Sequence, residues 1–322
     1  MENKYYNWID IAKGIGIILV ILGHTCPGKT SHAIFLFHMP LFFIISGYLF
    51  NFEKYQNNFL ALVKTSAKRL ILPVLIIYFI FYPFNQASLP SLIYGSGKHL
   101  ELSGFNISAI EYSAWFLYCL FVVRILLWTL IKLGSKLSIN KFLLFIASFL
   151  CALLGSKLGE VFFFPWSFDI ALVALYLAYV GYLLRENNIM SLKKNHKISV
   201  AFFAAVIFFI DFKYFDLSMN EREYSNILIS LNAAILVTIT IFYISDLLEK
   251  IQKIKILKNI IEYLKYLGKN SILILLLHGD ISLSKVPNFI NSIYKLLLST
   301  CFVELFNNIK DLLFIKSATT KE

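Results

Sequence analysis

Residues Trp8 to Thr25 read WIDIAKGIGIILVILGHT, an apolar stretch with two charged residues near its start and a histidine near its end. Its length and hydropathy predict a membrane-spanning helix. At about 100° and ~1.5 Å per residue, Lys13 and His24 lie within ~20° on one face and ~16 Å apart along the axis, and Asp10 lies about 40° from His24. Ionisable groups at membrane depth are costly unless they face protein or water. The stripe therefore predicts a functional site.

The whole chain has the composition of a membrane protein. Its 322 residues are 58% hydrophobic and 15% charged, and mean hydropathy is +0.71. Apolar runs recur from end to end, and no stretch alternates as a water-facing core would. We therefore expect an all-α, polytopic membrane protein with a single integral-membrane domain over residues 1–322. The first apolar segment lacks a small-residue cleavage site, so we expect no cleavable secretory signal.

Ten spans are predicted, at roughly 9–26, 34–50, 69–84, 113–131, 141–155, 167–184, 198–212, 226–244, 271–284 and 289–307. With both termini in the cytoplasm, most of the 30 basic residues fall on the cytoplasmic side, as the positive-inside rule requires. Basic loops then account for the net charge of +11, and we expect no nucleic-acid partner. The partners that this composition predicts are membrane lipids.

Two loops are long. The outer loop, 85–112, contains glycines and a proline and is expected to cover an outward-facing cavity. The inner loop, 245–270, has apolar residues at helical spacing among lysines, which predicts an amphipathic helix on the inner membrane surface. Glu160 and Asp169 flank the outer start of the sixth span, where we expect solvated side chains.

Two histidines are predicted to meet at the outer face. His24 is a candidate general base, because imidazole titrates near neutrality, although a histidine at a span end is also tolerated as an interface residue. His38 precedes Pro40, which suits the first turn of a helix, and a loop of about a dozen residues places it beside His24. Two histidines at one depth make a better candidate site than either one alone.

Lys13 and Asp10 allow two interpretations. The lysine could hold a phosphate or an acyl oxygen, or it could extend to the headgroups and anchor the helix. Asp10 lies three residues earlier, so it could act in catalysis or neutralise the lysine.

Further candidates for substrate or donor binding lie in later spans. Arg124 is inside the fourth span, after Trp115, and needs an acidic group, carbonyls or a polar ligand. His278 lies midway along the ninth span. Asn270 and Ser271 open that span, and its free N–H groups would suit a phosphate, although helix capping also explains both residues.

Several familiar sites are missing from the sequence: it has no GxSxG, GxxxxGK[ST] or HExxH motif. The four cysteines show no paired spacing, so we expect no metal.

Four segments in order, DIAKGIGIILVILGH (Asp10–His24), FHMPLFFIISGYLF (Phe37–Phe50), WFLYCLFVV (Trp115–Val123) and YLGKNSILILLLH (Tyr266–His278), resemble the integral-membrane acyltransferase 3 family. The likeness is greatest to its fucose 4-O-acetylase-like branch, the sugar O-acetyltransferases of bacterial surface polysaccharides. It spans nearly the whole chain. In the family's first-helix pattern an arginine precedes the histidine by eleven positions; His24 matches the histidine, and Lys13 stands where arginine is commonest. That substitution keeps the charge and loses the planar fork.

The resemblance implies an O-acetyltransferase of the bacterial plasma membrane. Its donor would be cytoplasmic acetyl-CoA, and its acceptor a hydroxyl of a surface polysaccharide or lipid-linked sugar. His24, assisted by His38, would take the proton of the attacking hydroxyl, either directly or by way of an acetylated histidine. Two other functions fit intramembrane charges: a transporter or flippase of a polar lipid or glycan, and a non-catalytic subunit of a polysaccharide assembly complex. The paired broken helices common in transporters are not evident in the sequence.

Overall fold

The computed structural model describes residues 6–81, 89–102, 105–108, 110, 113–252, 255–279, 283 and 286–319. Most of these are helical. The long helices are α1 (Asn7–Thr25), α8 (Trp115–Lys136), α9 (Lys141–Val161), α10 (Phe168–Glu186), α11 (Lys194–Tyr214), α12 (Ile227–Ile251), α13 (Lys255–Lys269) and α15 (Asn288–Thr319). The shorter helices are α2 (Lys29–Phe35), α3 (His38–Tyr48), α4 (Phe52–Tyr55), α5 (Phe59–Ser66), α6 (Leu72–Phe81), α7 (Leu89–Tyr94) and α14 (Ser271–Leu277).

Seven helices in the described ranges are long and apolar enough to cross a membrane. They are Asn7–Thr25, Lys29–Tyr48, Trp115–Lys136, Lys141–Val161, Pro165–Glu186, Ile227–Ile251 and Asn288–Asn308. Together they confirm a polytopic, all-α membrane protein. Each overlaps one of the predicted spans, and several extend further, as α9 does to Val161.

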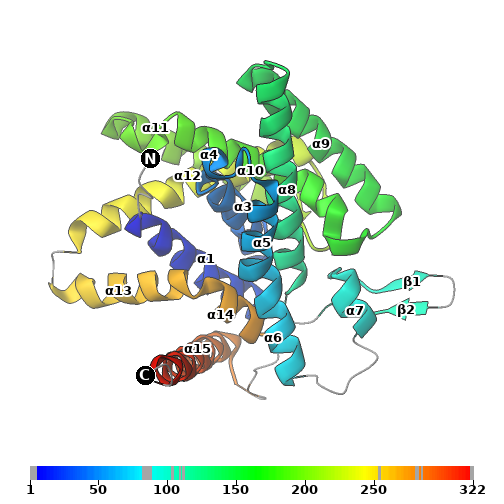
Figure 1. Cartoon of the computed structure of the whole chain (residues 1–322). Helices are drawn as coiled ribbons and strands as arrows, with labels where there is room; N and C mark the ends of the chain where they lie inside the picture. The colour runs from blue at the N-terminus through cyan, green and yellow to red at the C-terminus, as the bar shows by residue number, and fades with distance from the viewer. Residues whose placement is uncertain are drawn as a thin grey trace.

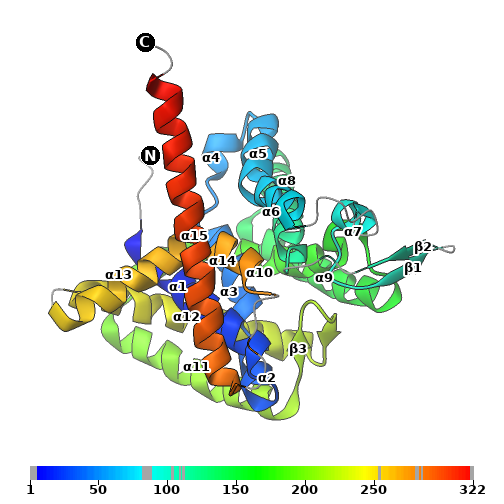
Figure 2. The same ribbon diagram turned by 90° about the horizontal axis from the view of Figure 1, so that it is seen from below.

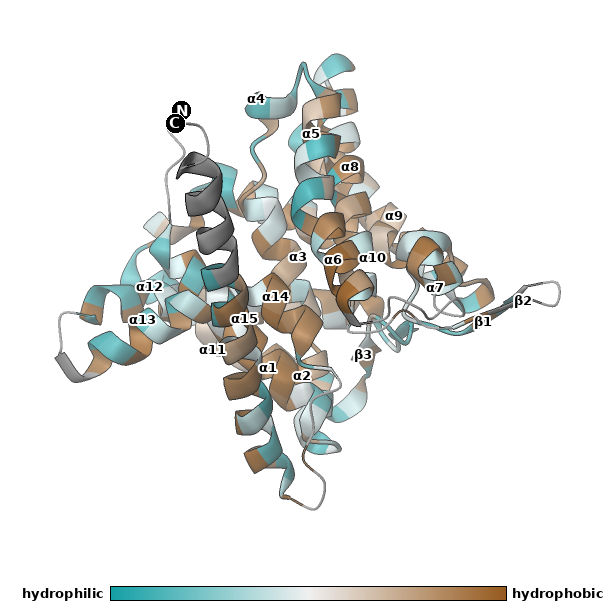
Figure 3. Ribbon diagram, turned by 60° about the horizontal axis from the view of Figure 1, so that its bottom comes forward, coloured by the Kyte–Doolittle hydropathy of each residue, from teal (hydrophilic) through white to brown (hydrophobic). Residues whose placement is uncertain are grey.

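Exposed apolar side chains form rows on three of the helices. Exposed side chains recur every three to four residues on α9, α11 and α15, which makes one continuous stripe on each helix. On α9 and α11 these are Phe142, Leu143, Ile146, Leu150, Leu154, Ile198, Phe202, Phe203, Val206, Phe209 and Ile210, and on α15 they are Phe289, Ile290, Ile293, Leu297, Phe302 and Leu305. Figure 3 shows the brown stretches on the lower part of α15 and along α6.

The ninth predicted span is much shorter than 271–284. Helix α14 ends at Leu277 after seven residues. The reason lies at His278, whose Nδ1 is 2.7 Å from the carbonyl oxygen of Leu275. A continuing helix would use that carbonyl to accept the N–H of Gly279. Residues 280–282 and 284 of the predicted span lie outside the described residues.

Helix α13 confirms the amphipathic helix predicted for the 245–270 loop. It runs beside α1 along most of its length (Figure 1). A Cβ added at Gly14 would meet the carbonyl of Leu264, and one added at Gly268 would meet the carbonyl of Asp10. The backbones of α1 and α13 therefore nearly touch at these two positions. Helix α15 then packs against α1 and α14 (Figure 2).

Helices α3 and α10 approach each other in the same way. Gly47 faces the carbonyl of Ala178, and Gly181 faces that of Ile44. Close backbone contact between small residues is a common way to join membrane helices, because it increases the packing area. Helix α10 in turn packs against α9 and α8, so α3, α8, α9 and α10 form one side of the bundle.

We expect Gly47→Ala to destabilise the protein by about 1–3 kcal/mol, because the added methyl group would meet the Ala178 backbone, which has no room to move. The matched control is Ala205→Val, which adds carbon atoms at an exposed position of α11. Thermal unfolding in one detergent would compare the two. Equal unfolding midpoints would show that the α3–α10 contact tolerates a side chain.

Two small β-ribbons lie between helices. Strands β1 (Leu100–Leu102) and β2 (Phe105–Ile107) follow α7 and project to one side (Figure 1), so part of the predicted 85–112 loop is structured. Residues 85–88, 103–104, 109 and 111–112 of that loop lie outside the described residues. Strands β3 (Leu217–Ser218) and β4 (Glu223–Tyr224) connect α11 to α12.

Candidate active site

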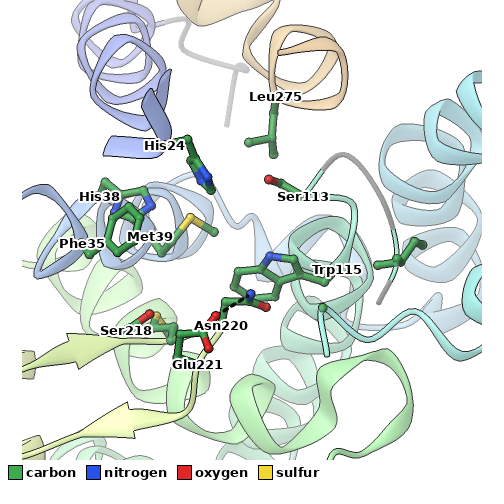
Figure 4. Close-up of a pocket in the computed structure, with 13 residues that line it drawn as sticks. His24, Phe35, His38, Met39, Ser113, Trp115, Ser218, Asn220, Glu221 and Leu275 are labelled. Atoms are coloured by element: carbon green, nitrogen blue, oxygen red, sulfur yellow. Dashed lines mark hydrogen bonds between the residues drawn. The ribbon is translucent and has the colours of Figure 1, made fainter. Parts of the chain in front are cut away.

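His24 lies at the wall of a cavity of about 330 Å³, here called the His24 cavity. The last turn of α1 positions the imidazole, which points into the cavity opposite Trp115 (Figure 4). The side chain is exposed to this space, whereas His38 is buried. The remaining lining residues come from α2, α3, α14, the start of α8, and the connections before α8 and between α11 and α12: Phe35, His38, Met39, Gly97, Ile110, Ser113, Trp115, Ser218, Met219, Asn220, Glu221 and Leu275.

Three histidines gather at this cavity. The ring centroid of His24 is 5.2 Å from that of His278 and 6.4 Å from that of His38. Nδ1 of His38 lies 3.0 Å from the carbonyl oxygen of Ile34, and Nδ1 of His278 lies 2.7 Å from that of Leu275. A carbonyl oxygen only accepts, so each Nδ1 carries the proton and each Nε2 keeps its lone pair. His24 is therefore next to two imidazoles whose Nε2 atoms are proton acceptors.

Lys13 lines a second cavity of about 320 Å³, the Lys13 cavity, nearer the first turn of α1. Five of its lining residues are basic, and none of the described lining residues is acidic. The basic ones are Lys13, Lys54, Arg69, Arg124 and Lys269. Such a concentration of positive charge in a partly enclosed space favours a ligand with several negative charges.

Two of these cations are held by neighbours. Nζ of Lys13 lies 2.6 Å from Oδ1 of Asp10, which confirms that the two residues pair. Nε of Arg124 donates to Oγ of Ser66 at 3.0 Å, and its guanidinium lies 5.5 Å from the ring centre of Phe50. Arg124 also lines the cavity. A fixed, planar guanidinium is suited to bind phosphate or carbonyl oxygens.

Arg69 reaches the cavity from a widened helical turn. The chain continues from α5 through a π-helical turn, Ala67–Ile71, into α6, and the N–H of Leu72 donates to the carbonyl of Ala67. Pro73 follows and has no N–H to donate. A π-turn before a proline frees backbone groups and rotates the side chains, and such turns are frequent at functional sites. The predicted span 69–84 therefore supplies a cation that lines the Lys13 cavity.

A thin wall separates the two cavities. Met39 of α3 and Leu275 of α14 line both. Both side chains are apolar, and no hydrogen bond holds either of them in place. Small movements of these two side chains would therefore let a long, narrow ligand extend from one cavity into the other. Figure 4 shows the Met39 thioether between His38 and Trp115.

The structure places the predicted site residues in three groups. His24, His38, Trp115 and the neighbouring His278 gather at one cavity, and Lys13, Arg124 and Ser271 line the other. Asp10 is buried between Lys13 and α13 and lines neither cavity. Asn270 also lines neither cavity, and its amide donates to the carbonyl of Tyr266.

Other lining residues were not predicted from the sequence. The turn Ser218–Glu221 belongs to the connection between α11 and α12, Lys54 to the short helix α4, Lys269 to the end of α13, and Arg69 to the start of the predicted span 69–84. The only sequence feature that could have pointed to the Ser218–Glu221 turn is Arg222, a basic residue in the connection that was predicted to lie on the outer side. Asp169 was expected to be solvated, and this was wrong: its side chain is buried and pairs with Arg222. Glu160 is exposed and pairs with Lys157, as expected for a solvated residue.

No metal site was expected. Across the part of the chain that the structure describes, no three His, Cys, Asp or Glu side chains gather closely enough to hold a metal ion.

Comparison with known proteins gives a family and two named relatives. The acyltransferase domain of the acyltransferase 3 family matches residues 6–308. The nodulation protein NolL of Sinorhizobium fredii is 33% identical over 121 residues, which are 34% of this chain and 32% of the relative. NolL of Mesorhizobium japonicum is 30% identical over 130 residues, 37% of this chain and 34% of the relative. The alignments thus span about a third of each relative. No solved structure matches.

Proposed function

This chain belongs to the acyltransferase 3 family, and from that premise we propose that it is a membrane-embedded O-acetyltransferase that transfers acetyl from acetyl-CoA to a hydroxyl of a surface polysaccharide or its lipid-linked precursor. The observation that carries the proposal is the pair of adjoining cavities. One has five cations and no acidic lining residue among those described, and the other holds His24. They share Met39 and Leu275 as a wall.

The Lys13 cavity is the donor site. Coenzyme A carries three phosphate groups, and cations bind phosphate through charge and N–H donors. Arg124 and Arg69 offer planar forks, while Lys13 and Lys54 act as point charges. The long pantetheine arm then extends past Met39 and Leu275 and presents the thioester to the other cavity.

The His24 cavity is the acceptor site. His24 takes the proton of a sugar hydroxyl as the hydroxyl oxygen attacks the acetyl carbon. The C–S bond breaks, the thiolate leaves, and the proton held on His24 passes to the sulfur, which gives the acetyl ester and free coenzyme A. While His24 carries that proton, the Nε2 lone pairs of His38 and His278 stabilise the imidazolium.

The same proposal sets the orientation in the bacterial plasma membrane. Ten segments cross, with the termini and the Lys13 cavity cytoplasmic and the His24 cavity facing outward. The apolar stripe of α11 and the apolar helix α6 support more crossings than the seven long helices alone. A single domain of this kind would use lipids, acetyl-CoA and a glycan as its partners.

Deletion and complementation test the proposal. Cells that lack the chain should lose O-acetyl groups from their surface glycan, and the wild-type chain should restore them, as measured by NMR of the isolated glycan. A flippase would instead change the amount of exported glycan without changing its acetylation. A non-catalytic subunit would restore acetylation even when His24 and Lys13 are both replaced.

Lys13 is expected to act through its charge. Lys13→Arg should keep the KM for acetyl-CoA near wild type, whereas Lys13→Ala should raise it by about tenfold, the loss of one charge-assisted hydrogen bond. Acetyl-CoA kinetics in nanodiscs would measure both. If both variants retain the wild-type KM, then Lys13 only anchors α1.

A further inference from the structure

The turn between β3 and β4 closes the His24 cavity on the side opposite His24. Ser218, Met219, Asn220 and Glu221 all line the cavity, although they come from the connection between two distant helices. Figure 4 shows Asn220 and Glu221 below Trp115, across the space from His24. A group bound between them and His24 would be held by the turn while its hydroxyl meets the base.

A buried ion pair fixes this turn. Nε of Arg222 donates to Oδ2 of Asp169 at 2.8 Å and Nη2 to Oδ1 at 3.4 Å, and both side chains are almost completely buried. Nη1 of the same arginine donates to the carbonyl of Asn220 at 2.8 Å. The guanidinium also lies 4.9 Å from the ring centre of Phe163. One side chain therefore ties the turn to the start of α10.

The backbone supports a positioning role. Arg222 has φ of 61°, a left-handed conformation that is unusual for a residue with a side chain. Its N–H donates to the carbonyl of Met219 at 3.3 Å, which closes the turn. Gly159 leaves room for the pair, since a Cβ there would lie 2.8 Å from Cγ of Arg222. A strained conformation persists only where several contacts enforce it, and this concentration of contacts lies at a cavity wall.

The β3–β4 turn also contacts the segment that follows α7, at Gly97 and Lys98. Asn220 Oδ1 packs against Gly97, and Glu221 forms an ion pair with Lys98. Tyr118 holds the other side of that connection by donating to the carbonyl of Leu92 at 2.8 Å. Both segments that border the cavity are thus fixed, and the shape of the acceptor site is largely preformed.

The chemistry facing the cavity is that of a neutral sugar site. The described lining residues include a carboxylate, an amide, two serine hydroxyls and an indole ring, but no lysine or arginine. Carboxylates and amides accept hydrogen bonds from sugar hydroxyls, and an indole offers a flat apolar face. Because Lys98 balances the charge of Glu221, the described lining offers no unpaired lysine or arginine to attract a carboxylate or phosphate on the acceptor. The volume of about 330 Å³ is at the lower end for ligand pockets, which suits one terminal sugar residue.

We propose that the β3–β4 turn is the acceptor-recognition element of this protein, that Glu221 binds hydroxyls of an uncharged sugar residue, and that Arg222 and Asp169 position it. This inference rests on the proposed acetyltransferase function and adds the class of acceptor: a neutral sugar, not a uronic acid or a phosphorylated one.

The test compares matched acceptors with the full chain in nanodiscs. Neutral methyl glycosides and the corresponding methyl glycuronides differ only in the C6 carboxylate. With labelled acetyl-CoA, the wild type should prefer the neutral members by about tenfold or more in kcat/KM, the value of one charge-assisted hydrogen bond. Glu221→Gln should raise the KM for neutral glycosides and reduce the preference, and Glu221→Lys should reverse it. The KM for acetyl-CoA should not change in either variant.

Two controls separate recognition from folding. Lys98→Gln breaks the same ion pair but keeps the carboxylate, so it should retain the preference for neutral glycosides. Arg222→Lys loses the fork and should raise the acceptor KM without raising the donor KM. A wild type that prefers glycuronides, a Glu221→Gln variant that keeps the full preference, or a Lys98→Gln variant that loses it overturns the inference. A wild type that acetylates no glycan overturns the proposed function itself.

Discussion

Replacing His24 with alanine is expected to lower kcat for glycan acetylation by about 10²–10⁴, the usual contribution of a general base. Binding of acetyl-CoA should change little, because the cations that would hold its phosphates line the other cavity. The variant should also insert and fold normally, since His24 is exposed and is not part of the packed interior. Single-turnover transfer from labelled acetyl-CoA would measure the first effect, and coenzyme A titration the second.

The matched control is His32→Ala. His32 binds the carbonyl of Phe212 through Nε2 at 3.0 Å and lies 3.2 Å from Asp216 through Nδ1, so it joins α2 to α11 and lines neither cavity. This control should retain most of the transfer activity. Wild-type kcat in His24→Ala, or an equal loss in His32→Ala, would contradict a base at His24.

The sequence carried enough information to predict the helices and one face of α1. Hydropathy depends on local composition, so the long apolar helices could be located, although α9 ends six residues and α12 seven residues beyond the predicted spans. Helical periodicity likewise put Lys13 and His24 on one stripe, and the structure places them at two cavities along it. The Asp10–Lys13 pair followed from their spacing of three residues.

The rest depended on contacts between distant segments. Nothing local to Asp169 indicates that Arg222, far along the chain, would bury it. The early end of α14 depends on a side chain of His278 that replaces a backbone donor. Arg69 faces a cavity because of a π-turn, a backbone change that hydropathy does not reveal. Each of these features is set by tertiary geometry, and each one shapes the candidate site.

The wall between the cavities is the strictest test of how donor and acceptor meet. If the acetyl group passes from the Lys13 cavity to His24, it must pass Met39 and Leu275, which line both.

Leu275→Trp should therefore reduce acetyl transfer by about 10² or more, because an indole at this point fills the passage and a misplaced reacting group loses its alignment. Affinity for coenzyme A without the acetyl group should remain within about threefold, since the five cations of the Lys13 cavity are untouched and a threefold change is below 1 kcal/mol. Leu275→Ala should keep transfer, because it widens the passage.

Leu273→Trp is the matched control. It adds the same ring on the same helix, at a residue that lines neither cavity. Calorimetry for binding and labelled transfer for activity separate the two effects. Full transfer in Leu275→Trp would mean that the acetyl group reaches His24 by another route, and loss of both binding and transfer would mean that the substitution disrupts the donor site rather than the passage.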